Sequence, residues 1–223
     1  MYSVVVPARP NEQFLSAALD SIAAQTVMAA AVIVVVNGPD SHNSSASMIV
    51  RDHVLHPVLV ETSRPSAAHA LSLGLTHVQT TYVSFLDADD EWESDKQCGQ
   101  LTLMDANPDW DAVVGRVANF RTGPDGHRLV EPVRAGRLFS AMTFHTRAFA
   151  KAGTPDPAAE HFTWLYRWWS GAQRAGLATG HDDRLVLLRR IHESNGWVKE
   201  RDAGRRQLLG ELRRLSRERE SRA

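Results

Sequence analysis

One stretch of the chain decides the fold: Tyr82-Val83-Ser84-Phe85-Leu86-Asp87-Ala88-Asp89-Asp90-Glu91-Trp92. It is an apolar run that ends abruptly in carboxylates. Buried strands of a parallel sheet read as short continuous apolar runs, and ligands of open α/β sheets bind outside the carboxyl ends of the strands. The stretch therefore predicts a buried strand that brings acidic side chains to a ligand-binding edge.

Three aspartates, Asp87, Asp89 and Asp90, fall within this short segment. Their charges repel one another, and a hard divalent cation with oxygen ligands is the group that most readily holds such carboxylates together. We therefore expect a metal ion with a bound phosphate at this edge. The alternative is an acidic loop that caps the next helix, because Asp and Glu are favoured in a first helical turn.

Strand-like and helix-like runs alternate in the first half of the chain. Strands are expected at 3–6, 32–36, 58–61 and 81–86, and helical spacing is found at 12–24, 44–53 and 66–77. This alternation predicts an α/β fold with a mostly parallel central sheet and helices on both faces. Pro and Gly breakers follow the strands, so the loops after them should meet at the acidic edge.

The second half is less regular. We expect a strand at 111–120, a turn at 123–126, a helix at 158–175 and a further strand at 184–189. Residues 198–223 place leucines at helical spacing among arginines and glutamates, which predicts an amphipathic basic helix. We expect it to pack on its own domain, and the alternatives are a peripheral membrane contact, an acidic partner or a homodimer contact. We expect one domain at 1–197, followed by that helix.

Composition excludes several classes of protein. The 223 residues suit one domain, and a net charge of -1 with 23% charged residues argues against a nucleic-acid-binding protein. Cys98 is the only cysteine, so a disulfide within the chain and a multi-cysteine zinc site are excluded. A reducing compartment fits this composition, and no apolar run is long enough to span a membrane. We expect a cytoplasmic protein.

Three segments, in this order and at this spacing, resemble family 2 glycosyltransferases of the GT-A fold. The resemblance covers residues 1–105. The segments are the opening strand and loop Ser3-Val4-Val5-Val6-Pro7-Ala8-Arg9, the helix end Leu19-Asp20-Ser21-Ile22-Ala23-Ala24-Gln25-Thr26, and Phe85-Leu86-Asp87-Ala88-Asp89-Asp90-Glu91-Trp92, which is similar to the family's DxD segment. The resemblance implies a GT-A type nucleotide-diphospho-sugar transferase fold, with a nucleotide-sugar-binding half at 1–105 and an acceptor half at 106–197.

The resemblance also implies the donor site. Asp87 and its neighbour Ala88 would contact the nucleotide side of the donor, and Asp89 would bind Mg²⁺ or Mn²⁺ that bridges the diphosphate. A divalent ion at this point stabilises the charge that develops as the nucleoside diphosphate leaves. The residues that would line the base and ribose are Pro7, Ala8 and Arg9.

Arg64 and Asn37 are two further residues that we expect to contact the donor. Arg64 precedes the third crossover helix, where it could reach the base or phosphate, or be a solvated loop arginine. Family members commonly carry an acidic pair where this chain has Asn37, whose amide can pair with a base edge without a charge-assisted bond. The resemblance implies a UDP-sugar first, and the missing acidic pair keeps GDP- and dTDP-sugars open as alternatives.

The resemblance places the general base at an acidic pair that opens a Trp-rich helix, where this chain has Glu160 and His161. Inverting transfer needs a group that takes the proton of the acceptor as it attacks the anomeric carbon. Glu160 is the first candidate and the imidazole of His161 the second. The alternative for Glu160 is a first-turn glutamate stabilised by the helix dipole.

Residues 189–195 resemble an "R-R-x-H-x-x-N" segment that closes many such domains. The resemblance implies that His192 is a further metal ligand and that Arg189 or Arg190 clamps the diphosphate. A lone histidine is more often structural, and this alternative stays open for His192.

The sequence thus predicts a metal-dependent, inverting glycosyltransferase that moves a sugar from a nucleotide-diphosphate donor to an acceptor. A glycan, a lipid-linked sugar, a peptide and a small metabolite are all open as acceptors. The alternative is a catalytically silent module that binds a nucleotide sugar or a partner, because the acidic pair is missing and His161 stands in the base motif. Nucleotidyltransferases and dinucleotide dehydrogenases are disfavoured, because no glycine-rich phosphate loop follows the first strand.

Overall fold

The fold is known from a computed structural model that describes residues 1–159 and 163–192. Two sets of predicted residues lie outside this part of the chain. They are the general-base candidates Glu160 and His161, and the amphipathic helix of 198–223.

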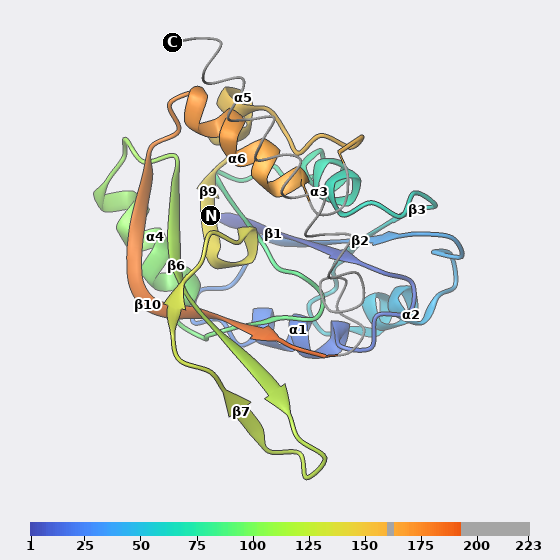
Figure 1. The fold of residues 1–223 in the computed structure, drawn as a ribbon. Coiled ribbons are helices and arrows are strands. Elements are labelled where there is room, and N and C mark those ends of the chain that lie inside the picture. Colours follow the sequence, from blue (N-terminus) through green and yellow to red (C-terminus); the bar gives the residue numbers. More distant parts are fainter. Residues whose placement is uncertain (160–162, 193–223) are drawn as a thin grey trace.

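The first half alternates strands and helices as predicted (Figure 1). Two of the helices begin directly after serine caps: the hydroxyl of Ser44 accepts the N–H of Ser47, and that of Ser66 accepts the N–H of His69. In chain order the elements are β1 (Tyr2–Ala8), α1 (Leu15–Ala23), β2 (Ala31–Asn37), α2 (Ser45–Asp52), β3 (Val58–Thr62), α3 (Ala67–Leu75) and β4 (Tyr82–Phe85).

The second half holds elements that the sequence did not predict. They include α4, whose buried residues are mostly polar, so that its hydrophobic periodicity is weak. The elements are β5 (Glu91–Trp92), α4 (Lys96–Ala106), β6 (Ala112–Thr122), β7 (Arg128–Val130), β8 (Arg134–Ala135), the 3₁₀ turn η1 (Phe139–Ala141), β9 (Met142–His145), α5 (Arg147–Ala152), α6 (Trp164–Arg174) and β10 (Thr179–Arg190).

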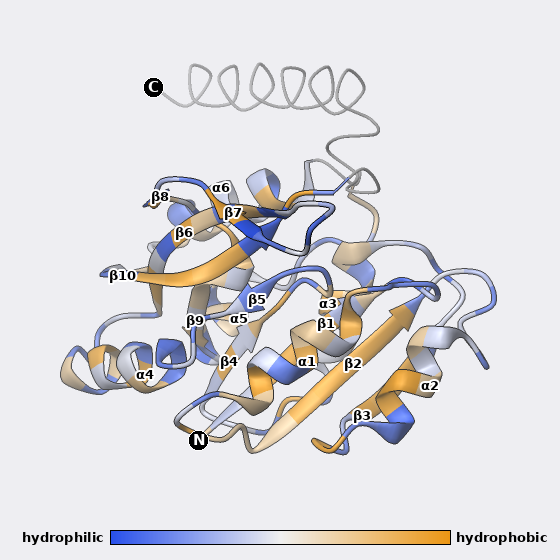
Figure 2. Ribbon diagram, turned by 90° about the horizontal axis from the view of Figure 1, so that it is seen from below, coloured by the Kyte–Doolittle hydropathy of each residue, from blue (hydrophilic) through white to orange (hydrophobic). Residues whose placement is uncertain are grey.

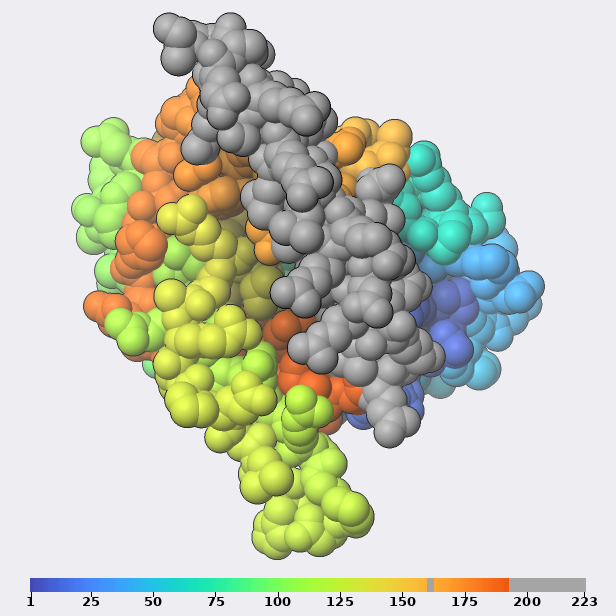
Figure 3. Space-filling model, in the orientation of Figure 1, coloured from blue at the N-terminus to red at the C-terminus, as the bar shows by residue number. Residues whose placement is uncertain are grey.

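Several boundaries differ from the expected ones. β10 begins at Thr179 rather than at 184, because its polar first residues pair with β6 although they carry no apolar pattern. Residues 158–159 lie in a turn, so the helix expected from 158 is α6, described from Trp164. The turn at 123–126 is confirmed by a bond from the N–H of Gly126 to the carbonyl of Gly123. It joins β6 to β7 in a hairpin that projects from the body of the molecule (Figure 1 and Figure 3).

The strands form one mixed sheet in the order β3-β2-β1-β4-β9-β6-β10-β5. The predicted parallel arrangement holds among β3, β2, β1 and β4, and β6 is also parallel to β10. β9 runs antiparallel to both β4 and β6, and so joins the two parallel parts. The loops that leave β1, β2, β3 and β4 therefore open at the same edge.

Helices cover both faces of the sheet, as predicted. In Figure 1, α1 and α2 lie below the central strands, and α3, α5 and α6 lie above them. Alternate residues of β1 supply the two cores, with Val4 and Val6 facing α1 and α2, and Val5 facing α3. Figure 2 shows β2 as strongly hydrophobic, as expected for a strand buried on both faces. Among the described helices, none has the length and apolar character needed to cross a membrane.

Candidate functional site

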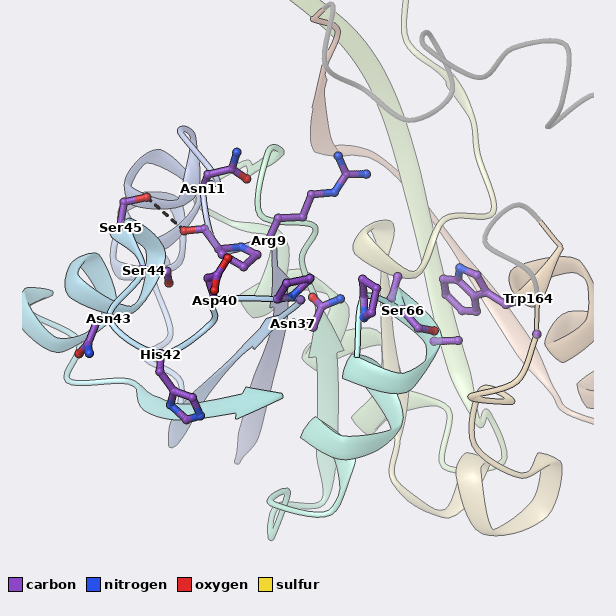
Figure 4. Close-up of a pocket in the computed structure, with 17 residues that line it drawn as sticks. Arg9, Asn11, Asn37, Asp40, His42, Asn43, Ser44, Ser45, Ser66 and Trp164 are labelled. Carbon is purple, nitrogen blue, oxygen red and sulfur yellow. Dashed lines mark hydrogen bonds between the residues drawn. The ribbon is translucent and has the colours of Figure 1, made fainter. Parts of the chain in front are cut away.

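Loops from three parallel strands line a cavity of about 980 Å³ at the carboxyl edge of the sheet (Figure 4). Arg9 and Pro10 follow β1, Asn37 ends β2, residues 38–40 and 42–44 follow β2, and residues 65–68 lie at the start of α3. Ala159 and Trp164 close the cavity from the second half of the chain. The loops after β1, β2 and β3 thus meet at this edge, and Arg9 and Asn37 lie on the cavity wall. Of the other residues predicted to bind the donor, Pro7, Ala8, Asp87 and Ala88 are not among those that line this cavity.

Asn37 is almost buried, with 7% of its surface exposed. In the amide orientation that its neighbours favour, its nitrogen donates to the carbonyl of Ala8 at 2.9 Å and its oxygen accepts the N–H of Ser66 at 3.2 Å. Both polar atoms are therefore used to tie the end of β1 to the start of α3. A base edge would have to displace one of these bonds to pair with Asn37.

Asp40 and Trp164 are not among the predicted donor-binding residues, and both line the cavity. Asp40 has a φ of 59° and Asn43 a φ of 60°, in the left-handed region that Asp and Asn tolerate. The breaker cluster at 37–39 was the available signal, because such residues mark an irregular loop. Asp40 is the single carboxylate among the described residues that line the cavity.

Glu61 on β3 holds the loop after β2 in place. Its carboxylate accepts the hydroxyl of Ser47 at 2.7 Å and lies 2.6 Å from Nδ1 of His42, which lines the cavity. These contacts, the Ser47 bond first, lower the pKa of Glu61. Glu61 on β3 therefore fixes the loop that forms part of the cavity wall.

The acidic segment follows β4 and does not cap a helix. β5 comes directly after it, and α4 starts only at Lys96, where Asp95 makes no capping bond through its side chain. The helix-capping alternative is therefore wrong. The three aspartates thus lie in the loop between β4 and β5, at the carboxyl end of β4.

The environments of Asp87 and Asp90 differ. Asp87 is exposed at the surface, but protein atoms pack around its carboxyl group. The resulting desolvation, and then the charge of Asp89, raise the pKa of Asp87 to about 6. Asp90 is buried and accepts the N–H of Arg190 at 2.9 Å. Burial and its two acidic neighbours raise the pKa of Asp90 well above its ordinary value. Asp90 thus supports the segment from inside, while Asp87 faces outward.

Asp89 and His192 lie side by side, although 103 residues separate them in the sequence. Oδ2 of Asp89 is 3.1 Å from Nε2 of His192, and the imidazole ring packs against Phe14 with 4.8 Å between ring centroids. Glu12 is close by: burial and then the charge of Asp89 raise the pKa of Glu12, and His192 acts in the opposite direction. The structure thus brings together the two residues predicted to bind a metal.

The chemistry of this pair fits a divalent metal such as Mn²⁺, which accepts carboxylate oxygen and imidazole nitrogen ligands. Within residues 1–159 and 163–192, no group of three or more His, Cys, Asp and Glu side chains is arranged to hold a metal ion. Asp89 and His192 therefore make an incomplete ligand set, which a diphosphate could complete with its own oxygens.

The two predicted arginines face different groups. The guanidinium of Arg190 pairs with Glu91, donates to the carbonyl of Asp89 at 3.1 Å and stacks on Phe14 and Phe120. Its side chain is only 9% exposed, so it holds the acidic segment from behind. The charge of Arg189 acts on the carboxylates of Asp87 and Asp90. Arg190 is thus bound to the acidic segment through several contacts, whereas Arg189 acts on it through its charge.

Arg64 reaches across to the second half of the chain. Its guanidinium donates to the carbonyl of Pro157 at 2.8 Å, and the hydroxyl of Ser72 on α3 donates to that of Pro155 at 2.5 Å. Arg64 is not among the residues that line the cavity. It fastens the segment that leads to Ala159 and then to Glu160.

Comparison with known proteins agrees with this geometry. Residues 3–167 match the family described as "Glycosyl transferase family 2". The chain belongs to glycosyltransferase family 2. The resemblance seen in three short segments is thereby confirmed, and the match extends through the acidic segment to the helix that carries Trp164.

Solved structures share the fold of this family 2 chain. S. aureus TarS 1-349 in complex with UDP has 14% identity and a TM-score of 0.62, over 86% of this chain and 61% of that one. TarS 1-349 in complex with UDP-GlcNAc has 13% identity and a TM-score of 0.62, over 87% and 59%. TarS 1-349 alone has 12% identity and a TM-score of 0.66, over 85% and 60%. The chain thus spans less than two thirds of these TarS chains. Among curated proteins, none matches it by sequence.

Proposed function

We propose that this family 2 chain is a metal-dependent, inverting glycosyltransferase that uses a nucleotide-diphosphate sugar. The observation that carries the proposal is the 3.1 Å pairing of Asp89 with His192 at the carboxyl edge of the sheet that bears the cavity. The TarS structures with UDP and UDP-GlcNAc support a UDP-sugar as the donor.

Different residues of the site would bind different parts of the donor. Asp89 and His192 would hold Mn²⁺ or Mg²⁺, which supplies neutralisation of the charge that builds on the leaving diphosphate. Arg189 would add a fixed positive charge beside the acidic segment, and Asp87 would bind the nucleotide side of the donor. The cavity behind Arg9 would receive the nucleoside.

Glu160 is the proposed general base, with His161 as the second candidate. Glu160 comes directly after Ala159, which lines the cavity, and Arg64 and Ser72 fasten the segment before it. The base would take the proton of the acceptor as its oxygen attacks the anomeric carbon on the side opposite the diphosphate. The carbon–oxygen bond to the diphosphate breaks in the same step.

A thermal-shift titration with UDP, GDP, dTDP and their sugars, with and without MnCl₂, tests donor binding. A ligand at one hundred times its Kd should stabilise the fold by about 2.7 kcal/mol. Asp89→Ala should remove the part of the shift that depends on Mn²⁺, and Asp109→Ala, an exposed carboxylate away from the site, should keep it. If no nucleoside diphosphate shifts the wild-type protein, the proposal is wrong.

Release of nucleoside diphosphate from a bound nucleotide sugar separates the enzyme from a silent binding module. We expect release by the wild-type protein and a large loss in Glu160→Gln at unchanged donor affinity. Binding without release, across acceptors of all four open classes, would favour the silent module.

A further inference from the structure

Buried Ser140 holds Asp87 through its hydroxyl group. The hydroxyl oxygen accepts the N–H of Asp87 at 3.1 Å. The same hydroxyl favours the ionised carboxylate of Asp87, because it acts to lower the pKa of this group. Ser140 is only 1% exposed and lies in η1, in the second half of the chain. The outward-facing aspartate of the acidic segment is thus held from the other half of the fold.

Ser140 is itself held by a row of buried side chains. Three successive carbonyls, beginning with that of Ser140, each accept a donor from the segment that follows the acidic cluster. The bonds run from Trp92 Nε1 to Ser140 at 2.7 Å, from Gln100 Nε2 to Ala141 at 3.0 Å and from Lys96 Nζ to Met142 at 3.2 Å. None of the three donor residues is more than 4% exposed. The backbone at 140–142 therefore has little freedom.

Burial of these polar side chains is unfavourable for folding. A buried lysine is disfavoured unless its ammonium group is satisfied, and burial lowers the pKa of Lys96 well below its ordinary value. The ammonium lies 4.2 Å from the centroid of the Trp92 ring and has no carboxylate within ion-pairing distance among the described residues. Trp92, Lys96 and Gln100 all donate to backbone carbonyls of residues 140–142, and they therefore fix the position of the Ser140 hydroxyl.

We propose that Ser140 is a positioning residue for the donor, which keeps the Asp87 carboxylate turned toward the nucleotide. The inference rests on the proposed function, in which Asp87 contacts the donor. Without the hydroxyl, the backbone N–H of Asp87 loses its acceptor, and the carboxylate loses a favourable neighbour while the like charge of Asp89 remains beside it. The carboxylate then spends less time in the binding orientation, and donor affinity falls.

Ser140→Ala tests the inference against Ser84→Ala as a matched control. Ser84 is also a fully buried serine near the acidic segment, and its hydroxyl bonds Thr143 and Gln97 rather than an aspartate. Both variants should lower Tm. We expect Ser140→Ala to weaken the binding of UDP, GDP or dTDP with MnCl₂ by about 10- to 100-fold, as for other residues that orient a binding group. Ser84→Ala should leave the affinity within about two-fold of the wild type, because Asp87 keeps its partner.

Calorimetric titration below the Tm of all variants gives the decisive comparison. Equal affinity in Ser140→Ala and the wild type overturns the inference, as does an equal loss in both variants, since that would reflect general loosening of the fold. If Ser140→Ala does not fold, Ser140→Cys keeps a weak donor of similar size and should show an intermediate loss; wild-type affinity there overturns the inference. A wild-type protein that binds none of the nucleotides overturns the proposed function itself.

Discussion

Asn37 shows how a single residue can depart from the usual family pattern for a structural reason. Its amide donates to Ala8 and accepts from Ser66, so it joins the first strand to the third helix across the cavity wall. A carboxylate accepts hydrogen bonds but does not donate them. An aspartate here would therefore place a negative oxygen against the carbonyl of Ala8.

We predict that Asn37→Asp lowers the free energy of unfolding by about 1–3 kcal/mol, the usual cost of a buried polar group left without its partner. Urea denaturation at neutral pH measures the change. Asn43→Asp is the control, because Asn43 is an exposed residue of the same cavity and a change within about 0.5 kcal/mol is expected. Equal stability of Asn37→Asp and the wild type would show that the two amide bonds contribute nothing.

At the scale of elements, the close approach of α3 to the sheet depends on Gly74. A Cβ atom at this position would lie 2.4 Å from Cγ1 of Val5 and 3.2 Å from Cγ2 of Val35. Taken alone, a glycine inside a helix reads as a weak point of that helix. The packing explains it, because only a residue without a side chain lets α3 lie this close to β1 and β2.

We predict that Gly74→Ala destabilises the protein, although alanine is the better helix former by about 1 kcal/mol. Overpacking of a dense core costs about 1–3 kcal/mol and outweighs that gain. Gly171→Ala in α6 is the matched control, because a Cβ there meets nothing within 4 Å and the helix gain should appear alone. Tm values of the two variants should move in opposite directions, and a rise in both would contradict the packing argument.

At the scale of the whole molecule, Asp111 joins three parts of the second half. Its carboxylate accepts from Lys151 and Arg147 on α5, at 2.9 and 3.2 Å, and from the N–H of Ala178 before β10, at 2.9 Å. Burial alone would raise the pKa of Asp111, but these bonds outweigh it and hold the pKa below its ordinary value. The ionised form is therefore the one that stabilises the fold.

A carboxyl group with a depressed pKa stabilises the folded state above its unfolded pKa, about 3.9 for aspartate, and loses that effect as the pH falls through the folded pKa. We predict that Asp111→Asn costs about 1–3 kcal/mol at pH 7, since bonds to charged groups are lost. The difference from the wild type should shrink below about pH 4, which urea denaturation at several pH values measures. A difference that stays constant or grows in acid would contradict this account.

The proposed site also depends on the whole molecule, because its residues come from both halves of the chain. Asp89 follows β4 and His192 follows β10, and their contact depends on β9 and β6, which place β10 on the same sheet as β4. Arg64 makes the corresponding link on the other side of the cavity, from the loop before α3 to Pro157. Each half of the chain thus supplies groups that the other half orients.

The α/β alternation, the place of the acidic segment at a strand end and the family could all be predicted from the sequence. These features follow from local signals: apolar periodicity, breakers and short motifs are read within a few residues. The sequence also named Asp89 and His192 as partners, through the family resemblance and not through any local pattern.

Only the tertiary structure decided α4, the antiparallel β9, and the bonds made by Asn37, Arg190 and Ser140. The buried face of α4 is polar, so no hydrophobic pattern marks it. The bonds of Ser140 to Asp87 and of Arg64 to Pro157 join residues 53 and 93 positions apart. Such contacts are set by how the sheet brings distant strands together, and no local pattern in the sequence carries that information.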